Sequence, residues 1–409
     1  MKSSPTTGPD AIAEDRQGTP GEVFRAFLKL GLTSFGGPIA HLGYFRDELV
    51  LRRKWIDEAG YADLVALCQF LPGPASSQVG FALGLLRGGP WGALAAWTAF
   101  TLPSALLLVL FASATSLFEG ALGAGMLHGL KIVAVAVVAQ AVWGMARSLT
   151  PDRERASIAL AAVLVVVFAG GAVGQVAAIV IGAVAGIVFC RNNPVSAGNH
   201  LAFRVPRRVG IACLVTFFSL LLLLPIVAST TAHQGLSLID SFYRAGSLVF
   251  GGGHVVLPLL EAEVVRPGWV TGDAFLAGYG AAQAVPGPLF TFAAYLGAVM
   301  GPAPNGMAGA AICLVAIFVP GFLLLVGALP FWDEFRGRPL AQAAMRGANA
   351  AVVGILGAAL YDPVWVSAIL NPHDFALALI GFILLIVWKT PPWIVVLLLA
   401  AGAIGLSLL

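Results

Sequence analysis

The sequence is poor in charged residues: only 11% of its 409 residues are charged, against about 25% in an ordinary soluble protein. Its four cysteines are far apart and form no CxxC pair, so neither a disulfide framework nor a thiolate metal site is indicated. The net charge of +3 is small and its cations are scattered, which disfavours a nucleic-acid partner. No nucleotide-binding glycine loop and no HExxH pattern occurs, so we expect no cofactor, no bound metal and no enzymatic activity.

Apolar residues dominate instead: 59% of the chain is hydrophobic and the mean hydropathy is +0.90. About 13 apolar segments are candidates to cross or enter a bilayer. The sequence therefore predicts an all-α polytopic membrane protein, which we place in a bacterial cytoplasmic (inner) membrane. Residues 1–22 are polar and lack the apolar core of a signal peptide, and we expect them to form a disordered cytoplasmic tail.

The distribution of Lys and Arg favours a cytoplasmic N-terminus, because alternating spans then place most cations in inside loops. One segment is an exception. Residues 44–58 carry Arg46, Arg52, Arg53 and Lys54 on the predicted outer side. This segment is amphipathic, so we expect it either to lie along the membrane interface or to fold back into the protein.

The chain matches itself at an offset of about 215 residues. The matches, in order, pair Phe35-Gly36-Gly37 with Phe250-Gly251-Gly252, Glu48 with Glu263, Trp55 with Trp269, Pro72-Gly73-Pro74 with Pro286-Gly287-Pro288, Pro103 with Pro320, and His128 with Arg346. We therefore predict a first membrane repeat at 23–190, a basic cytoplasmic loop with a linking transmembrane helix at 191–234, and a second repeat at 235–409.

The direction of the repeat follows from counting. Each half holds about six apolar segments, and one further segment near 210–228 separates them. About seven crossings then precede the second half, and an odd number inserts it upside down relative to the first. Inverted repeats around a site near the bilayer midplane are frequent in secondary transporters.

Each half contains two motifs that should interrupt a helix inside the membrane. Gly-Gly withdraws the side chains that support a helix, and Pro removes a donor and clashes with the preceding turn. Lipid cannot satisfy the freed backbone groups, so such breaks must face protein or water. A helix that restarts after a break presents unpaired N–H groups and a partial positive charge, which favour an anion.

We predict that substrate binding involves these motifs and nearby polar residues: Lys29, Thr33, Ser34, Phe35, Gly36, Gly37, Gln69, Pro72, Gly73, Pro74, Ser76, Arg244, Phe250, Gly251, Gly252, Gln283, Pro286, Gly287, Pro288 and Thr291. The alternatives are ordinary ones. The motifs could be simple kinks, the cations could snorkel from helix ends, and the hydroxyls could bond their own backbone.

Four further residues are candidates for gating or proton coupling: His41, Glu48, His254 and Glu263. The alternative for the two acids is a structural salt bridge. The alternative for the two histidines is a satisfied position in the protein core.

The run Gly31–Pro38, then Trp55, then Gln69–Pro74, together with its second-half counterparts, resembles the chromate ion transporter family. The resemblance extends from about residue 22 to the end and is similar to the long, two-domain form. It implies export of chromate, chromate resistance, and sulfate as a competing ligand. Uptake of sulfate or another oxyanion, a channel, and a membrane-embedded enzyme are the alternatives. Lipid is an expected partner, and a homodimer is left open.

Overall fold

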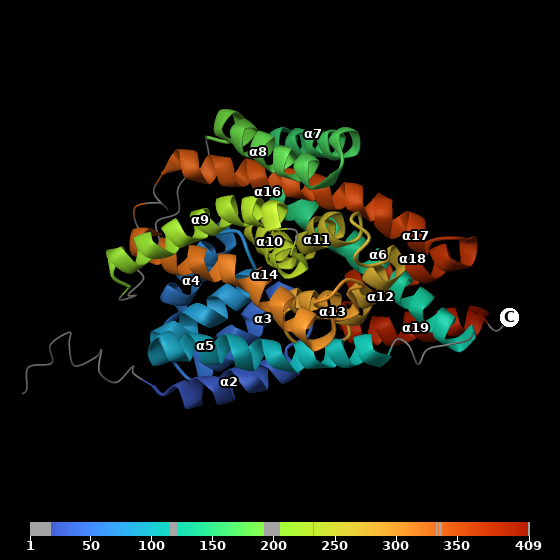
Figure 1. Ribbon diagram of the computed structural model, residues 1–409, viewed down its shortest axis with the longest axis horizontal. Helices are drawn as coiled ribbons and strands as arrows, with labels where there is room; N and C mark the ends of the chain where they lie inside the picture. The colour runs from blue at the N-terminus through green and yellow to red at the C-terminus, as the bar shows by residue number, and fades with distance from the viewer. Residues whose placement is uncertain are drawn as a thin grey trace, which may run out of the picture.

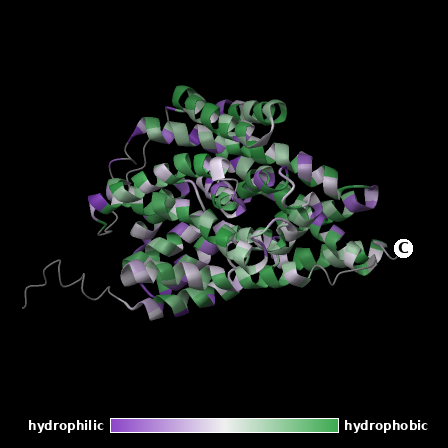
Figure 2. Cartoon of the chain, viewed as in Figure 1, coloured by the Kyte–Doolittle hydropathy of each residue, from purple (hydrophilic) through white to green (hydrophobic). Residues whose placement is uncertain are grey.

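The computed structural model describes residues 18–114, 121–191, 205–231, 233–332, 334 and 338–407. Within these ranges every regular element is helical and no strand occurs. Residues coloured as hydrophobic predominate along most of the helices in Figure 2, and many large apolar side chains are exposed. This surface suits lipid, because a soluble protein rarely exposes so much contiguous apolar area. Most of the predicted tail at 1–22 and of the basic loop after residue 191 lies outside the described residues.

The first half opens with four short segments and one long one. Thr19 caps the first helix through its side chain, which accepts a hydrogen bond from the Glu22 N–H at 3.2 Å. Two glycines with non-helical dihedral angles, Gly88 and Gly89, divide the fifth helix into two. The elements are α2 (Pro20–Thr33), α3 (Gly37–Phe45), the π-helical η1 (Arg46–Arg52), α4 (Glu58–Phe70) and α5 (Ala75–Ala114).

The chain then runs through longer helices that surround this core. Gly170 and Gly171 make the short turn between α7 and α8, so these two helices run antiparallel. The elements are α6 (Ala121–Leu149), α7 (Arg153–Ala169), α8 (Gly171–Phe189) and the linking helix α9 (Arg207–Thr231).

The second half repeats this order. The 3-10 segments η3 and η4 follow the two motifs, and a π-helical η6 follows the long helix α16. The elements are α10 (Gln234–Ser247), η3 (Gly253–Val255), α11 (Val256–Val264), α12 (Gly272–Ala282), η4 (Leu289–Thr291), α13 (Phe292–Val299), α14 (Gly306–Ala328), η5 (Leu329–Phe331), α16 (Pro339–Ala359), η6 (Leu360–Trp365), α17 (Val366–Ala368), α18 (Pro372–Ile386) and α19 (Pro392–Ser407).

The short helices fold back on one another. The Tyr295 hydroxyl of α13 donates to the Ala274 carbonyl of α12 at 2.9 Å, and the rings of Phe275 and Phe292 lie 5.2 Å apart. In the first half, Phe27 of α2 packs against Phe45 at the end of α3, with ring centroids 5.5 Å apart. Helices that pair in this antiparallel manner form re-entrant hairpins, which enter and leave on the same side.

The two parts of α5 also turn back, because Gly84 and Gly92 approach too closely for a side chain on either. Gly297 of α13 and Gly309 of α14 make the matching contact in the second half. Such small-residue contacts let membrane helices approach closely.

The roughly 13 apolar segments expected from the sequence therefore do not amount to 13 crossings. Six helices of the described part are long and apolar enough to cross a bilayer, and α5 is counted among them as one helix. Several of the remaining apolar segments are halves of hairpins. At roughly 1.5 Å per residue, such a short helix does not reach across the bilayer. Two of them that form a hairpin return to their starting side and add no crossing.

Each of the two halves packs one of its long helices against the other half. Helix α6 of the first half packs against α18 and α19 of the second, and α16 of the second half packs against α7 and α8 of the first (Figure 1). Close contacts between glycines and small residues mark both interfaces: Gly129 meets Ala400, and Gly186 meets Gly347. Each half thus contributes one long helix to a helix pair of the other half.

Candidate functional site

All four predicted interruptions are present. Helix α2 ends at Thr33 and α3 begins at Gly37, while α4 ends at Phe70 and α5 begins at Ala75. In the second half, α10 ends at Ser247 before η3, and α12 ends at Ala282 before η4. We call these four turns the hairpin tips: residues 34–36, 71–74, 248–252 and 283–288.

Glycine is required at the tips by backbone geometry. The φ angles of Gly36 and Gly251 are +100° and +73°, and those of Gly73 and Gly287 are +117° and +101°. Residues with a Cβ rarely adopt this left-handed region. Gly37 and Gly252 also have positive φ values, so the two Gly-Gly pairs reverse the chain in the same way. The repeated glycines therefore encode the same turn twice.

The tips bond crosswise between the halves. The N–H of Gly73 donates to the carbonyl of Val249 at 2.7 Å, and the N–H of Gly287 donates to the carbonyl of Ser34 at 2.9 Å. The second motif of each half thus holds the first motif of the other half. Backbone groups freed by the breaks are satisfied by protein in these two places, as a site remote from lipid requires. Four motifs that are far apart in the sequence meet at one place.

The amide of Gln78 supports this junction, although no sequence motif indicated it. Its Nε2 donates to the carbonyl of Pro72 at 3.0 Å and to the carbonyl of Gly321 at 2.9 Å. It therefore links the second tip to α14 of the other half. The available signal in the sequence was an amide residue within an apolar segment, one helical turn after Pro-Gly-Pro, and the structure buries that amide fully.

A cluster of buried polar groups lies beside the tips in the first half. Ser34 and His41 are fully buried, and the Nδ1 atom of His41 lies 3.4 Å from the hydroxyl of buried Ser76. The Ser34 hydroxyl, the Nε2 atom of His41 and the hydroxyls of Ser77 and Thr101 have no hydrogen-bond partner among the described residues. Buried polar groups normally have partners, so this cluster of unpartnered groups is a candidate to bind a polar ligand or water.

Other predicted hydroxyl donors bond to the protein. The Thr33 hydroxyl donates to the Lys29 carbonyl at 2.8 Å, and the Thr291 hydroxyl donates to the Pro288 carbonyl at 2.7 Å. The Ser104 hydroxyl in turn donates to the Thr291 oxygen at 2.8 Å, which joins α5 to the fourth tip.

Lys29 and Arg244 occupy matching positions and pair with matching acids. The Lys29 ammonium lies 2.8 Å from Glu48, and the Arg244 guanidinium lies 2.9 Å from Glu263. The two pairs have the same sequence separation of 19 residues. Each ion pair links the two antiparallel segments of one hairpin, away from its tip: α2 to η1 in the first half and α10 to α11 in the second.

The charges around the two pairs differ. Glu48 also binds Arg52 at 2.9 Å and Arg53 at 2.8 Å, so three cations surround one acid. Arg244 also binds Asp240 at 3.0 Å, so two acids surround one cation. Asp240 was not among the predicted site residues.

The remaining candidates are dispersed around the tips. The Nδ1 atom of His254 lies 2.6 Å from the Tyr279 hydroxyl, and Gln283 donates to the Tyr279 carbonyl at 3.3 Å. Gln69 is exposed at the end of α4, and Phe35 packs against Trp393 with ring centroids 6.2 Å apart. Phe250 is half-buried beside its two glycines.

Residues 44–58, the basic segment predicted on the outer side, lie at the end of the first-half hairpins opposite their tips. We call this end the first-half base. The guanidinium groups of Arg53 and Arg87 both lie 5.7 Å from the ring centre of Trp55. Gly18 donates its N–H to the Arg87 carbonyl at 2.8 Å, so the start of α2 is at the same end. Residues 44–58 therefore fold back, the second of the two predicted possibilities, and return to the side of α2's first residues.

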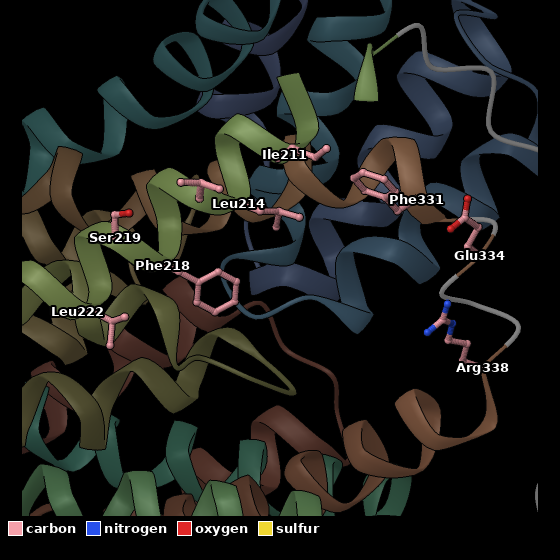
Figure 3. A pocket seen from close by; sticks show the side chains of 9 residues that line it. Ile211, Leu214, Phe218, Ser219, Leu222, Phe331, Glu334 and Arg338 are labelled. Carbon is pink, nitrogen blue, oxygen red and sulfur yellow. The ribbon is translucent and has the colours of Figure 1, made fainter. Parts of the chain in front are cut away.

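No group of three or more metal-ligating side chains is found in the part of the chain that the structure describes. An apolar groove runs along α9. Ile211, Leu214, Phe218 and Leu222 line it, and Glu334 and Arg338 stand at one end (Figure 3). Its apolar walls suit lipid chains better than an oxyanion, and its lining includes no residue of the hairpin tips.

Two sets of re-entrant hairpins that meet tip to tip within a membrane-embedded helical bundle define a multi-pass membrane transporter. The comparisons with known proteins agree: a family model described as "Chromate transporter" matches residues 21–187 and again residues 236–406. The chain belongs to the chromate transporter family, as the resemblance of its motifs predicted. It is a transporter and not an enzyme.

Three relatives illustrate the similarity. The chromate transport protein of Pseudomonas aeruginosa is 31% identical over 407 residues, covering 94% of this chain and 91% of the relative. A probable chromate transport protein of Synechococcus elongatus is 29% identical and covers 94% of this chain and 95% of its own length. The chromate transport protein of Cupriavidus metallidurans is 28% identical, covering 82% and 80%. No solved structure matches the chain.

Proposed function

We propose that this protein is a secondary transporter that exports chromate across the bacterial cytoplasmic membrane. The observation that carries the proposal is the crosswise bonding of the four hairpin tips, Gly73 to Val249 and Gly287 to Ser34. Such a junction is where a transporter with two similar halves binds its substrate. The names of the relatives supply the substrate, since those proteins are described as chromate transport proteins.

The two halves, 23–190 and 235–409, are oppositely oriented in this proposal. Hairpins and the α7–α8 pair return to their starting side and do not change the count of crossings. The second part of α5, helix α6 and the linking helix α9 then decide the orientation, and three crossings still invert the second half. The sequence analysis expected about seven crossings before the second half, and three is also an odd number. The inference of inversion is therefore unaffected.

The cytoplasmic placement of the N-terminus is also supported. With residues 44–58 folded back, Arg52, Arg53, Lys54 and Arg87 lie on the side of α2's first residues. The same orientation places Arg147, Arg153, Arg155, Arg191, Arg207, Arg208, Arg338 and Lys389 inside. Among the described loops, Arg266 is then the main cation on the outer side. This bias is stronger than the one that the sequence suggested.

The substrate would bind between the tips, where chromate is a tetrahedral dianion with four acceptor oxygens. The N–H groups of the restarting helices and the buried Ser34, His41, Ser76 and Ser77 are the nearest available donors. Lys29 and Arg244 would add charge from below the tips. His41, Glu48, His254 and Glu263 remain candidates for gating or proton coupling.

The membrane potential supplies a driving force for export. Each charge gains about 2.3 kcal/mol per 100 mV, so a dianion leaving a negative interior gains roughly 4.6 kcal/mol. That free energy corresponds to more than three decades of concentration gradient at about 1.4 kcal/mol per decade. Export would therefore proceed without nucleotide hydrolysis.

The homodimer left open by the sequence stays a prediction.

The test is chromate flux in proteoliposomes under an imposed potential, with sulfate as competitor. We expect saturable flux that increases when the compartment of origin is made negative. Flux that is independent of potential would contradict export driven by charge movement, and flux that never saturates would indicate a channel. Transport of sulfate with no transport of chromate would leave the fold assignment intact and replace the substrate.

A further inference from the structure

Helix α2 carries a row of exposed polar positions that leads to the first tip. Arg25, Lys29 and Thr33 follow one another at four-residue spacing, so they lie along one side of the helix. The row ends at Gly36, which is also exposed. We call these four residues the α2 track. Arg25 forms no ion pair with any residue that the structure describes.

The α2 track is unsuited to lipid. The side chain of Lys29 is 52% exposed although it lies about 13 Å along the helix from Pro20. A cation facing hydrocarbon costs about 2.5–3.5 kcal/mol or more, and its ion pair with Glu48 keeps Lys29 from reaching the interface. Water against this side of α2 removes that cost.

The matching positions in the second half are less open, although the last of them, Gly251, is exposed as Gly36 is. Asp240, Arg244, Leu248 and Gly251 correspond to the four residues of the α2 track. Asp240 is buried, Leu248 replaces a threonine, and the Arg244 side chain is 32% exposed and held by two acids. Helix α10 thus presents no continuous polar row.

The two sides also differ in sign. Beside the α2 track, Arg25, Lys29, Arg52 and Arg53 outnumber Glu48. Beside α10, Asp240 and Glu263 outnumber Arg244. A cleft lined with one sign of charge raises the local concentration of the opposite ion.

We propose that the α2 track lines a water-filled vestibule, open on the side of the first-half base, which admits oxyanions and rejects cations on the way to the tips. The opposite mouth, beside Asp240, binds anions more weakly. The identity of the anion rests on the proposed function, but the vestibule and its charge do not. The difference in charge sets the affinity on each side, whereas the gradient and the potential set the direction of net flux.

The test measures thiol reactivity at two matched positions, Thr33→Cys and Leu248→Cys, in the full chain in sealed vesicles of both orientations. The reagents are a pair of membrane-impermeant methanethiosulfonates, one with a sulfonate and one with a trimethylammonium group. Of the native cysteines, Cys68, Cys190 and Cys313 are buried and Cys213 is half-buried, so the parent chain is the background control.

We expect Thr33→Cys to react from the side of the first-half base only, about tenfold faster with the anionic reagent after correction for intrinsic reactivity. Leu248→Cys should react at least tenfold more slowly. Adding Arg25→Gln should reduce the preference for the anionic reagent about threefold, while adding Asp240→Asn, the matched control, should leave it unchanged. No labelling of Thr33→Cys from either side, or a preference for the cationic reagent, would overturn the proposal.

Chromate flux in the same preparations separates the two proposals. Thiol reactivity as expected with no chromate flux would retain the vestibule and reject the substrate. Saturable chromate flux with an unreactive Thr33→Cys would retain the function and reject the vestibule.

Discussion

The two halves share a backbone design but differ in the side chains around it. Both contain positive-φ glycines at both tips, a close glycine pair and an ion pair of 19-residue separation. At five matched positions beside the tips, the side chain is polar in the first half and apolar in the second. Ser34, His41, Ser76, Gln78 and Thr101 correspond to Val249, Val256, Phe290, Phe292 and Phe318.

This difference indicates a division of labour. The second half contributes most of the largest buried apolar cluster, including Phe275, Phe292 and Tyr295, and so provides a rigid frame. The first half contributes the buried hydroxyl and imidazole groups that have no partner among the described residues. Duplication retained the turns, which only glycine can make, while the side chains around each turn were free to diverge.

The largest effect should come from Arg244→Gln, because it leaves Asp240 and Glu263 without their cation. Removing one partner of a buried pair costs about 3–5 kcal/mol. We expect a fall in the melting temperature of the detergent-solubilised protein and loss of transport with it, measured by thermal denaturation and chromate flux.

Lys29→Gln is the matched control in the first half. Glu48 keeps Arg52 and Arg53, and Lys29 is half exposed, so the cost should be less than about 1 kcal/mol. Equal destabilisation by the two substitutions would show that the charge difference between the halves is unimportant.

The tip glycines should be equivalent in the two halves. Gly73→Ala and Gly287→Ala each force a residue with a Cβ into the left-handed region, at about 1–2 kcal/mol, and crowd the junction. We expect each to lower the rate of chromate transport at least tenfold at equal protein amount.

Gly89→Ala is the control for backbone strain alone. Its φ is +62° and no atom lies within 4 Å of the added Cβ, but it lies away from the tips. Transport should change less than twofold. A loss as large as at Gly73 would assign the effect to strain in general, and unequal losses at Gly73 and Gly287 would break the equivalence of the two halves.

The smallest effect concerns the polar group at the first tip. Ser34→Val copies the residue of the second half and removes a hydroxyl worth about 1 kcal/mol as a hydrogen-bond donor. The KM for chromate should increase about fivefold while kcat changes little, and the reverse substitution, Val249→Ser, should change KM less than twofold. A larger change at Val249 would place the ligand nearer the second half.

Several of these features were predictable because they depend on local sequence. Pro-Gly-Pro and Gly-Gly break a helix wherever they occur, and a matched Lys or Arg with a matched Glu suggests a pair. Hairpin formation was not predictable, since an apolar segment with a central break reads the same whether the chain continues across the bilayer or turns back. For that reason the sequence alone did not tell which apolar segments cross the bilayer. It also left Arg53 on the predicted outer side without an explanation.

By itself, the amino-acid sequence determined the membrane environment, the helical class, the duplication, the four breaks and the family, because hydropathy, residue type and spacing are properties of short segments. Only the tertiary structure decided which breaks meet and that Gln78 bridges the halves. Those contacts join residues that are close in space but up to 243 positions apart, and they follow from how helices pack rather than from any local pattern.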